Sequence, residues 1–307
     1  MHPAPVTYVH AVWLGLLQGL TEFLPVSSTA HMDVVPQLFH QRDPGAAFSA
    51  IAQLGPIIAI VLYFWSDIGR YIKGIIRTRT PRNVAADDLD ARLGWYTLLG
   101  TIPIIIFGVL LEKKIDTSFR RLPVVAASLI LLGLVLWVSE IIGKKRTKLD
   151  QMTMADSQVV GWAQVLALVP GASRSGVTIT AGLFRNFDRE TAARFSFLLS
   201  IPAITAAGLY KLLKSLKAGG LAGAAGPGIV AAVVAGLLAY VVIRWFLGYM
   251  KEHNTGIFIA YRILAGLAIL WLLHAGTIKE KPVKRNAAVI SAARLASRPP
   301  NSAPLRS

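Results

Sequence analysis

The stretch Leu168–Gly182, LVPGASRSGVTITAG, places an arginine and several hydroxyls behind a Pro-Gly break in a hydrophobic protein. Arg174 has three hydroxyl neighbours, Ser173, Ser175 and Thr178. A planar guanidinium binds two phosphate oxygens at once, and hydroxyls and N–H groups at a helix start add further donors. A charged residue at membrane depth is costly and points to a functional site. The stretch therefore predicts a phosphate-binding site; the alternative is a polar loop at the membrane surface.

The composition is that of an integral membrane protein. Of the 307 residues, 54% are hydrophobic and 16% are charged, and the mean hydropathy is +0.55. Cysteine is absent, which excludes disulfides, a thiol nucleophile and thiolate metal sites. The formal net charge is +16, but the basic residues are scattered between apolar stretches. This favours anionic lipid headgroups, and not nucleic acid, as the counter-surface.

Six apolar stretches are long enough to cross a membrane, which takes about 20 predominantly apolar residues. They are Phe48–Trp65, Leu93–Leu111, Leu122–Ile142, Thr191–Leu213, Ile229–Tyr249 and Gly256–Ala275. The basic residues between the first two, from Arg70 to Arg82, are expected to form a loop. Membrane orientation stays open, because basic loops fall on both sides of the predicted spans.

Four further segments are too short to span. They are Tyr8–Leu24, Met32–Phe39, Val159–Val169 and Gly176–Phe184. The eleven residues of Val159–Val169, for example, would cover only about 16 Å as a helix, roughly half the hydrocarbon core. Each half of the chain thus has a broken pair of short segments followed by three spans, with matching prolines at Pro25 and Pro170. A serine lies three residues beyond each proline, at Ser28 and Ser173.

Three spans per half is an odd number, so the second half must enter the membrane inverted. The predicted fold is an all-α integral membrane protein with six transmembrane helices and two re-entrant helix hairpins in inverted-topology repeats. It forms one polytopic domain over residues 1–275, with repeat one at about 6–142 and repeat two at about 157–275. Residues 276–307 are predicted to form a basic, disordered tail.

A second polar cluster lies in Leu14–Met32, LGLLQGLTEFLPVSSTAHM. Gln18 and Glu22 are four residues apart and share one helix face. Beyond the proline, Ser27 or Ser28 is suited to cap the next helix.

His31 falls on the same helix face as Ser27 and Ser28, so the hairpin offers a carboxylate, a hydroxyl and an imidazole. Singly, each has a structural explanation: Glu22 as an interfacial polar residue, the histidine as a packing residue, the serines as caps. Together, within ten residues of a segment too short to span, they favour a site.

The motifs LTEFLPVSSTAH (Leu20–His31) and PGASRSG (Pro170–Gly176) resemble the two signatures of the undecaprenyl-diphosphate phosphatases of the bacitracin-resistance family. The similarity in segment order extends from about Tyr8 to about Ala275. It implies two re-entrant hairpins and six spans, and hydrolysis of the terminal phosphate of undecaprenyl diphosphate to supply the monophosphate carrier lipid for cell-wall synthesis. It also implies a divalent cation, Mg²⁺ or Ca²⁺, and a site open to the outer face of the bacterial cytoplasmic membrane.

Matching to the family motifs implies six functional residues: Glu22, Ser28, His31, Ser173, Arg174 and Thr178. The chain departs from the family at Gln18, where many members have glutamate. A neutral amide is a poorer metal ligand than a carboxylate, which weakens a metal role at this position.

The expected mechanism is metal-assisted phosphoryl transfer to water, in which positioning and charge stabilisation dominate. Glu22 is expected to hold the cation, and Arg174 to bind the phosphoryl group. Substrate contacts are expected from Gln18, Ser27, Ser173, Ser175 and Thr178. Two schemes stay open for the attack: Ser28 as nucleophile with His31 as its base, or water activated by His31 or Glu22 with the serine orienting it.

Two other functions remain compatible with the pattern. One is a transporter or flippase of a phosphorylated prenyl lipid, because inverted repeats with broken helices are also a transporter plan. The other is an envelope scaffold that retains a relic lipid site. The oligomeric state, a homo-oligomer included, is not encoded in any recognisable pattern.

Overall fold

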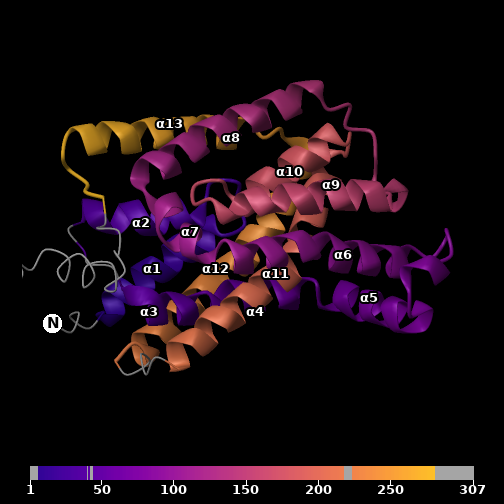
Figure 1. Cartoon of the computed structure of the whole chain (residues 1–307), viewed down its shortest axis with the longest axis horizontal. Coiled ribbons are helices and arrows are strands. Elements are labelled where there is room, and N and C mark those ends of the chain that lie inside the picture. The colour runs from indigo at the N-terminus through magenta and orange to yellow at the C-terminus, as the bar shows by residue number, and fades with distance from the viewer. Residues whose placement is uncertain (1–5, 40, 42–43, 218–222, 281–307) are drawn as a thin grey trace, which may run out of the picture.

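The computed structural model describes residues 6–39, 41, 44–217 and 223–280. Over these residues the secondary structure is helical, with no strand and a single isolated β-bridge between Thr147 and Phe187. Most of the predicted tail, from residue 281 onward, lies outside the described part of the chain. Figure 1 shows the long helices Leu122–Ile142 (α8) and Gly256–His274 (α13) side by side along the top of the molecule.

The described residues contain six helices long and apolar enough to cross a membrane, which confirms the six predicted spans. They are Gly45–Tyr63, made of α3 (Gly45–Ala52) and α4 (Leu54–Tyr63), α6 (Leu89–Leu110), α8 (Leu122–Ile142), α11 (Arg189–Lys217), α12 (Ala225–Glu252) and α13 (Gly256–His274). The prediction for α8 matches both ends of the helix. Helices α6 and α11 begin earlier than predicted because their polar caps, Asp88 and Asp188, lie outside the apolar run. Asp88 caps α6, and the N–H of Ala91 holds the pKa of its carboxyl below the ordinary value.

The short segments are also helices, and each pair is interrupted by a break. The first pair is α1 (Tyr8–Thr21) and α2 (Ser28–Leu38). The second pair is α9 (Met154–Gln164), extended by the 3₁₀ turn η4 (Val165–Leu168), and α10 (Arg174–Phe184). Figure 1 shows the first pair toward the left of the molecule and the second toward the right.

In each pair, the first short helix packs closely against a long helix through a glycine. A Cβ on Gly19 of α1 would lie 2.5 Å from the Ala235 carbonyl oxygen of α12. A Cβ on Gly161 of α9 would lie 2.3 Å from the Gly100 carbonyl oxygen of α6. Small residues let helix backbones approach this closely where no hydrophobic force acts between helices in lipid. The breaks between the short helices are therefore placed by backbone contact.

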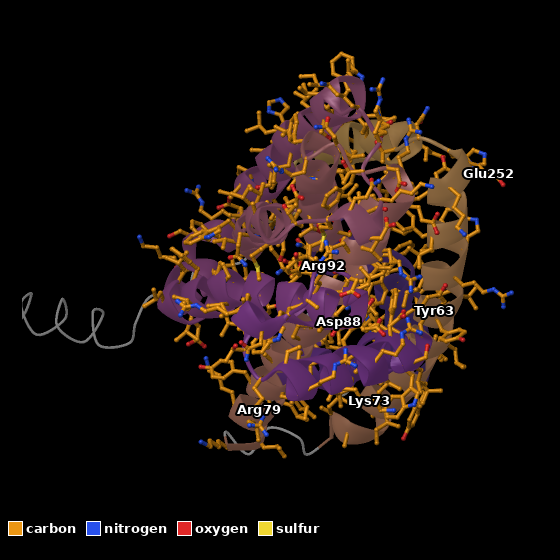
Figure 2. The ribbon with its side chains drawn as sticks, turned by 90° about the vertical axis from the view of Figure 1, so that its right-hand side faces the viewer. Tyr63, Lys73, Arg79, Asp88, Arg92 and Glu252 are labelled. Carbon is orange, nitrogen blue, oxygen red and sulfur yellow. The ribbon has the colours of Figure 1, made fainter. Side chains whose placement is uncertain are left out.

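The basic segment expected as a loop is in fact an amphipathic helix, α5 (Trp65–Thr78). Its buried face, with Tyr71, Gly74 and Thr78, packs against α6, while its basic side chains point outward. The prediction was wrong because it weighed the basic residues and overlooked the helical spacing of the residues that form the buried face. Burial and the neighbouring Asp67 raise the pKa of Tyr71 to about 12, so its hydroxyl stays protonated. Figure 2 looks onto this end of the molecule and labels Lys73.

We expect Gly19→Ala to lower the unfolding temperature, because the new methyl must push α1 away from α12. Overpacking of this kind costs about 1–3 kcal/mol. Gly69→Ala in α5 is the matched control: its Cβ would meet no atom within 4 Å. Alanine is the better helix former by about 1 kcal/mol, so the control should be as stable as the parent or more so. Thermal unfolding in detergent measures both, and equal behaviour of the two variants would contradict the close contact.

Candidate active site

The loops before α2 and α10 share one backbone feature. Ser27 has φ 71° and ψ 93°, and Ser173 has φ 63° and ψ 113°. Positive φ is uncommon outside glycine. Each serine also caps its helix, accepting from the N–H three residues on. The structure therefore matches Ser27 with Ser173, and Ser28 with Arg174, one residue away from the sequence-based alignment of Ser28 with Ser173.

The Glu22 carboxylate lies at the centre of the polar cluster. Its Oε2 accepts from the Ser28 hydroxyl at 2.8 Å and the Gln18 amide at 2.9 Å. Its Oε1 accepts from the Gln53 amide at 3.1 Å and from Arg174 Nη2 at 3.2 Å. The side chains of Glu22 and Arg174 are only 9% and 13% exposed. The two sequence motifs thus meet through a nearly buried ion pair.

His31 makes its contacts elsewhere. Its Nδ1 lies 2.8 Å from the Ser27 carbonyl oxygen, and its Nε2 is hydrogen-bonded to the Tyr261 hydroxyl of α13. The two rings stack with centroids 5.6 Å apart. A carbonyl only accepts, so Nδ1 carries the proton and Nε2 accepts from the tyrosine. Ser28 donates to Glu22. The nearest basic atom to this hydroxyl in the hydrogen-bond network is therefore a carboxylate oxygen, not the imidazole.

The remaining predicted residues support the two loops. Gln18 donates to both Glu22 and Gln53. Ser173 and Ser175 are buried, with their hydroxyl oxygens 3.2 Å apart.

Thr178 is fully buried, and its contacts are with protein groups. Its hydroxyl donates to the Arg174 carbonyl at 2.8 Å and is 2.7 Å from the Ser196 hydroxyl of α11. Thr178 therefore fixes the helix that carries Arg174 and does not face the Glu22 carboxylate.

A family profile described as "Bacitracin resistance protein BacA" matches residues 11–268. The chain belongs to this family. Proteins named undecaprenyl-diphosphatase from Pelodictyon phaeoclathratiforme and Chloroherpeton thalassium are 46% and 47% identical to it. These alignments cover 89% and 88% of this chain and 100% and 98% of the relatives. A protein of the same name from Trichormus variabilis is 48% identical, over 88% of this chain and 85% of the relative.

Sequence reasoning missed three members of the site: Gln53, Tyr261 and Arg262. A signal for two of them was present. Gln53 is a polar residue that interrupts the apolar run Phe48–Trp65, and Arg262 is a charged residue inside the predicted span Gly256–Ala275. Tyr261 gave no signal, because an exposed face of a transmembrane helix commonly carries tyrosine near the membrane interface.

Arg262 is fully buried and binds both loops at once. Its guanidinium donates to the carbonyl oxygens of Ala172 at 2.8 Å and Pro25 at 3.4 Å. Weaker contacts reach the carbonyls of Ser128, Leu129 and Gly171. A Cβ on Gly176 would lie 2.2 Å from its Nη1, so glycine leaves room for the guanidinium. Arg262 supplies the donors that the broken backbone lacks.

The donor set fits a divalent cation bound together with substrate, not a preformed cage. The described residues contain no group of three or more His, Asp or Glu side chains that would hold a metal alone. The site offers one carboxylate, Glu22, with the Gln53 amide oxygen and the Ser28 hydroxyl close to it. Magnesium is commonly held by one or two carboxylates and completed by phosphate oxygens and water.

We expect Arg262→Met to destabilise the protein strongly, because buried carbonyls of both loops lose their donor. Each unsatisfied group costs about 1–3 kcal/mol. Arg82→Met is the matched control, since Arg82 is exposed and lies outside the spans. Thermal unfolding in detergent should show a large loss for the first variant and little change for the second. A small change in the unfolding temperature of the Arg262→Met variant would mean that the two loops keep their structure without hydrogen bonds from Arg262.

Proposed function

We propose that this chain is a multi-pass membrane phosphatase that hydrolyses undecaprenyl diphosphate to undecaprenyl phosphate and inorganic phosphate. The observation that carries the proposal is the contact of Glu22, Ser28 and Arg174 across the two motifs. It places a base, a hydroxyl and a phosphate-binding group within one nearly buried cluster. The proposal is supported by relatives named undecaprenyl-diphosphatase that align with almost the whole chain.

Arg174 binds the terminal phosphoryl group in this proposal. Its guanidinium matches two phosphate oxygens, and it begins α10, where free N–H groups favour an anion. Without substrate it pairs with Glu22 Oε1. A diphosphate competes for the same guanidinium. Its binding therefore breaks the ion pair between Arg174 and Glu22 Oε1, while the hydrogen bond from the Gln53 amide to Oε1 remains. The positive charge is thus prearranged where negative charge develops during transfer.

Ser28 is the nucleophile and Glu22 its base. The hydroxyl already donates to Glu22 Oε2 at 2.8 Å, within the range for a nucleophile and its base. The serine oxygen attacks the terminal phosphorus, its proton passes to Glu22, and the bond to the prenyl monophosphate breaks. Glu22 gives that proton to the departing phosphate oxygen, which leaves the carboxylate free again. Water then attacks the phosphoserine, its proton passes to Glu22, and the bond between phosphorus and the serine oxygen breaks as that oxygen takes the proton back. His31 positions the Ser27–Ser28 loop through the Ser27 carbonyl.

A divalent cation, Mg²⁺ or Ca²⁺, would be held by Glu22 and would neutralise charge on the diphosphate. Gln18 and Gln53 keep the carboxylate oriented by donating amide hydrogens to its two oxygens. Gln18 therefore supports the metal-binding group without being a strong ligand itself. The prenyl chain lies along the apolar outer walls of the spans, where lipid is the natural neighbour.

We also propose that α1–α2 and α9–α10 are re-entrant hairpins in inverted repeats. The supports are the paired cap geometry of Ser27 and Ser173 and the equivalent glycine contacts with α12 and α6. The repeats form one polytopic domain over residues 1–275, with boundaries near 6–142 and 157–275. We propose that this domain lies in the bacterial cytoplasmic membrane with the site open to the outer face, as the resemblance to the family implies.

Phosphate release by purified protein in detergent tests the function. An enzyme needs no second membrane face, whereas a transporter does. Release that depends on a divalent cation and on the prenyl diphosphate would support the proposal, and no release under any metal condition would overturn it.

Ser28→Ala should abolish turnover, and the parent should yield a phosphoserine at position 28 after rapid acid quenching and mass spectrometry. Glu22→Gln keeps the shape but removes the base, and should lower turnover by about 10²–10⁴. Gln18→Glu, which restores the residue of many family members, should remain active. A substantial rate from the Ser28→Ala variant, with no phosphoserine in the parent, would assign the attack to water.

Arg174→Lys keeps the charge but replaces the planar fork by a point ammonium. If the fork grips two phosphate oxygens as charge develops, turnover should fall by about 10²–10³. The loss should appear in kcat more than in KM, because the prenyl chain still supplies uniform binding energy. Steady-state hydrolysis of a shortened prenyl diphosphate measures both, and turnover within a few-fold of the parent would remove Arg174 from the catalytic group.

A further inference from the structure

A second polar feature lies away from the candidate active site, between the ends of α4, α11 and α12. It is a pocket of about 180 Å³ lined by Tyr63, Glu190, Arg194, Arg244, Leu247, Gly248 and Lys251. Tyr63 ends the helix that begins beside Gln53, roughly 15 Å further along the helix axis. The pocket is therefore a separate compartment from the Glu22 cluster.

The pocket has an excess of positive charge. Arg194 is paired with Asp67 at 2.6 Å and lies over the Phe64 ring. Lys251 is paired with Glu190 at 3.2 Å, an exposed ion pair of small energetic value. Arg244 is exposed and makes no hydrogen bond or ion pair with the described part of the chain. An unpaired guanidinium and a loosely held ammonium thus face the same space.

Exposed aromatic side chains place this pocket at the level of lipid headgroups. Trp65 and Trp245 are 68% and 50% exposed, and the Trp245 ring lies 5.3 Å from that of Tyr249. Such aromatic residues gather at membrane–water interfaces. Figure 2 views this end of the molecule and labels Tyr63 and Glu252 toward the right. A phosphate carried by a membrane lipid would reach the pocket from the bilayer.

We propose that this pocket binds the phosphate of an anionic membrane lipid headgroup, held by Arg244 and Lys251. Basic pockets between transmembrane helices are a recognised mode of lipid headgroup binding. The guanidinium can make two hydrogen bonds to one phosphate. Inorganic phosphate offers the same chemistry, but only the lipid also uses the aromatic surface beside the pocket. The proposal does not depend on the reaction at the Glu22 cluster.

Substitutions at two positions, Gly248 and Arg244, test the site without touching the candidate active site. Gly248→Leu fills the pocket from its own wall, because a Cβ there would meet no atom within 4 Å. Gly69→Leu, on an equally open glycine outside the pocket, is the matched control. Arg244→Gln removes the unpaired charge, and Arg244→Lys keeps the charge without the fork. Binding is measured by native mass spectrometry and by unfolding temperature during titration of delipidated protein in neutral detergent.

Phosphatidylglycerol should bind the parent and the Gly69→Leu variant alike and raise their unfolding temperatures. The Gly248→Leu and Arg244→Gln variants should bind it at least about tenfold more weakly, a difference of about 1.4 kcal/mol, and Arg244→Lys should fall between. Phosphatidylcholine should have little effect, and inorganic phosphate at equal concentration should bind far more weakly. Equal lipid binding by all variants would overturn the site, and equal stabilisation by inorganic phosphate would overturn the lipid as its occupant.

Discussion

The ion pair between Glu22 and Arg174 is the interaction on which the rest of this structure depends. Each partner lies at the break between two short helices: Glu22 directly follows α1, and Arg174 begins α10. Both side chains are nearly buried. Removing either one would strand the other charge in an apolar bundle, which typically costs 3–5 kcal/mol. The pair therefore requires the two breaks to meet, although the residues are 152 positions apart. Gln18, Gln53 and Ser28 each donate a further hydrogen bond to the Glu22 carboxylate. In the mechanism we propose, the carboxylate acts as a base once a phosphate takes over the guanidinium.

The breaks between the short helices also need hydrogen-bond donors. Backbone carbonyls outside a helix have no partner within it, and lipid cannot supply one. Arg262 supplies donors from a third element, α13, and reaches carbonyls of both loops. Its charge has no carboxylate partner among these contacts; it is balanced by carbonyl dipoles. The two arginines thus have different tasks. Arg174 is proposed to bind the phosphoryl group, whereas Arg262 binds backbone carbonyls of both loops.

The sequence predicted the local features and the contact between the two motifs, but it missed the contacts that residues outside the motifs make with them. The ends of α8 followed from an uninterrupted apolar run, and the breaks at Pro25 and Pro170 followed from helix-stopping residues. Helix α5 was missed because its charges outweighed its apolar period. The match of Ser27 with Ser173 depends on dihedral angles, which residue spacing from a proline does not report. The partner of His31 was not predictable either. Helical spacing put it beside Ser28, but its ring turns to a tyrosine 230 residues away.

The contact of α1 with α12 has a consequence for how the protein is made. Helix α1 ends at Thr21, and the helix that receives it begins at Ala225, 204 residues later. At ribosomal speeds of about 5–20 residues per second, this separation takes about 10–40 s. During that time a half-length segment with a carboxylate at its end has no long helix to dock on and cannot span the bilayer alone. The first helix of the chain can therefore reach its docking partner only after most of the chain has been made.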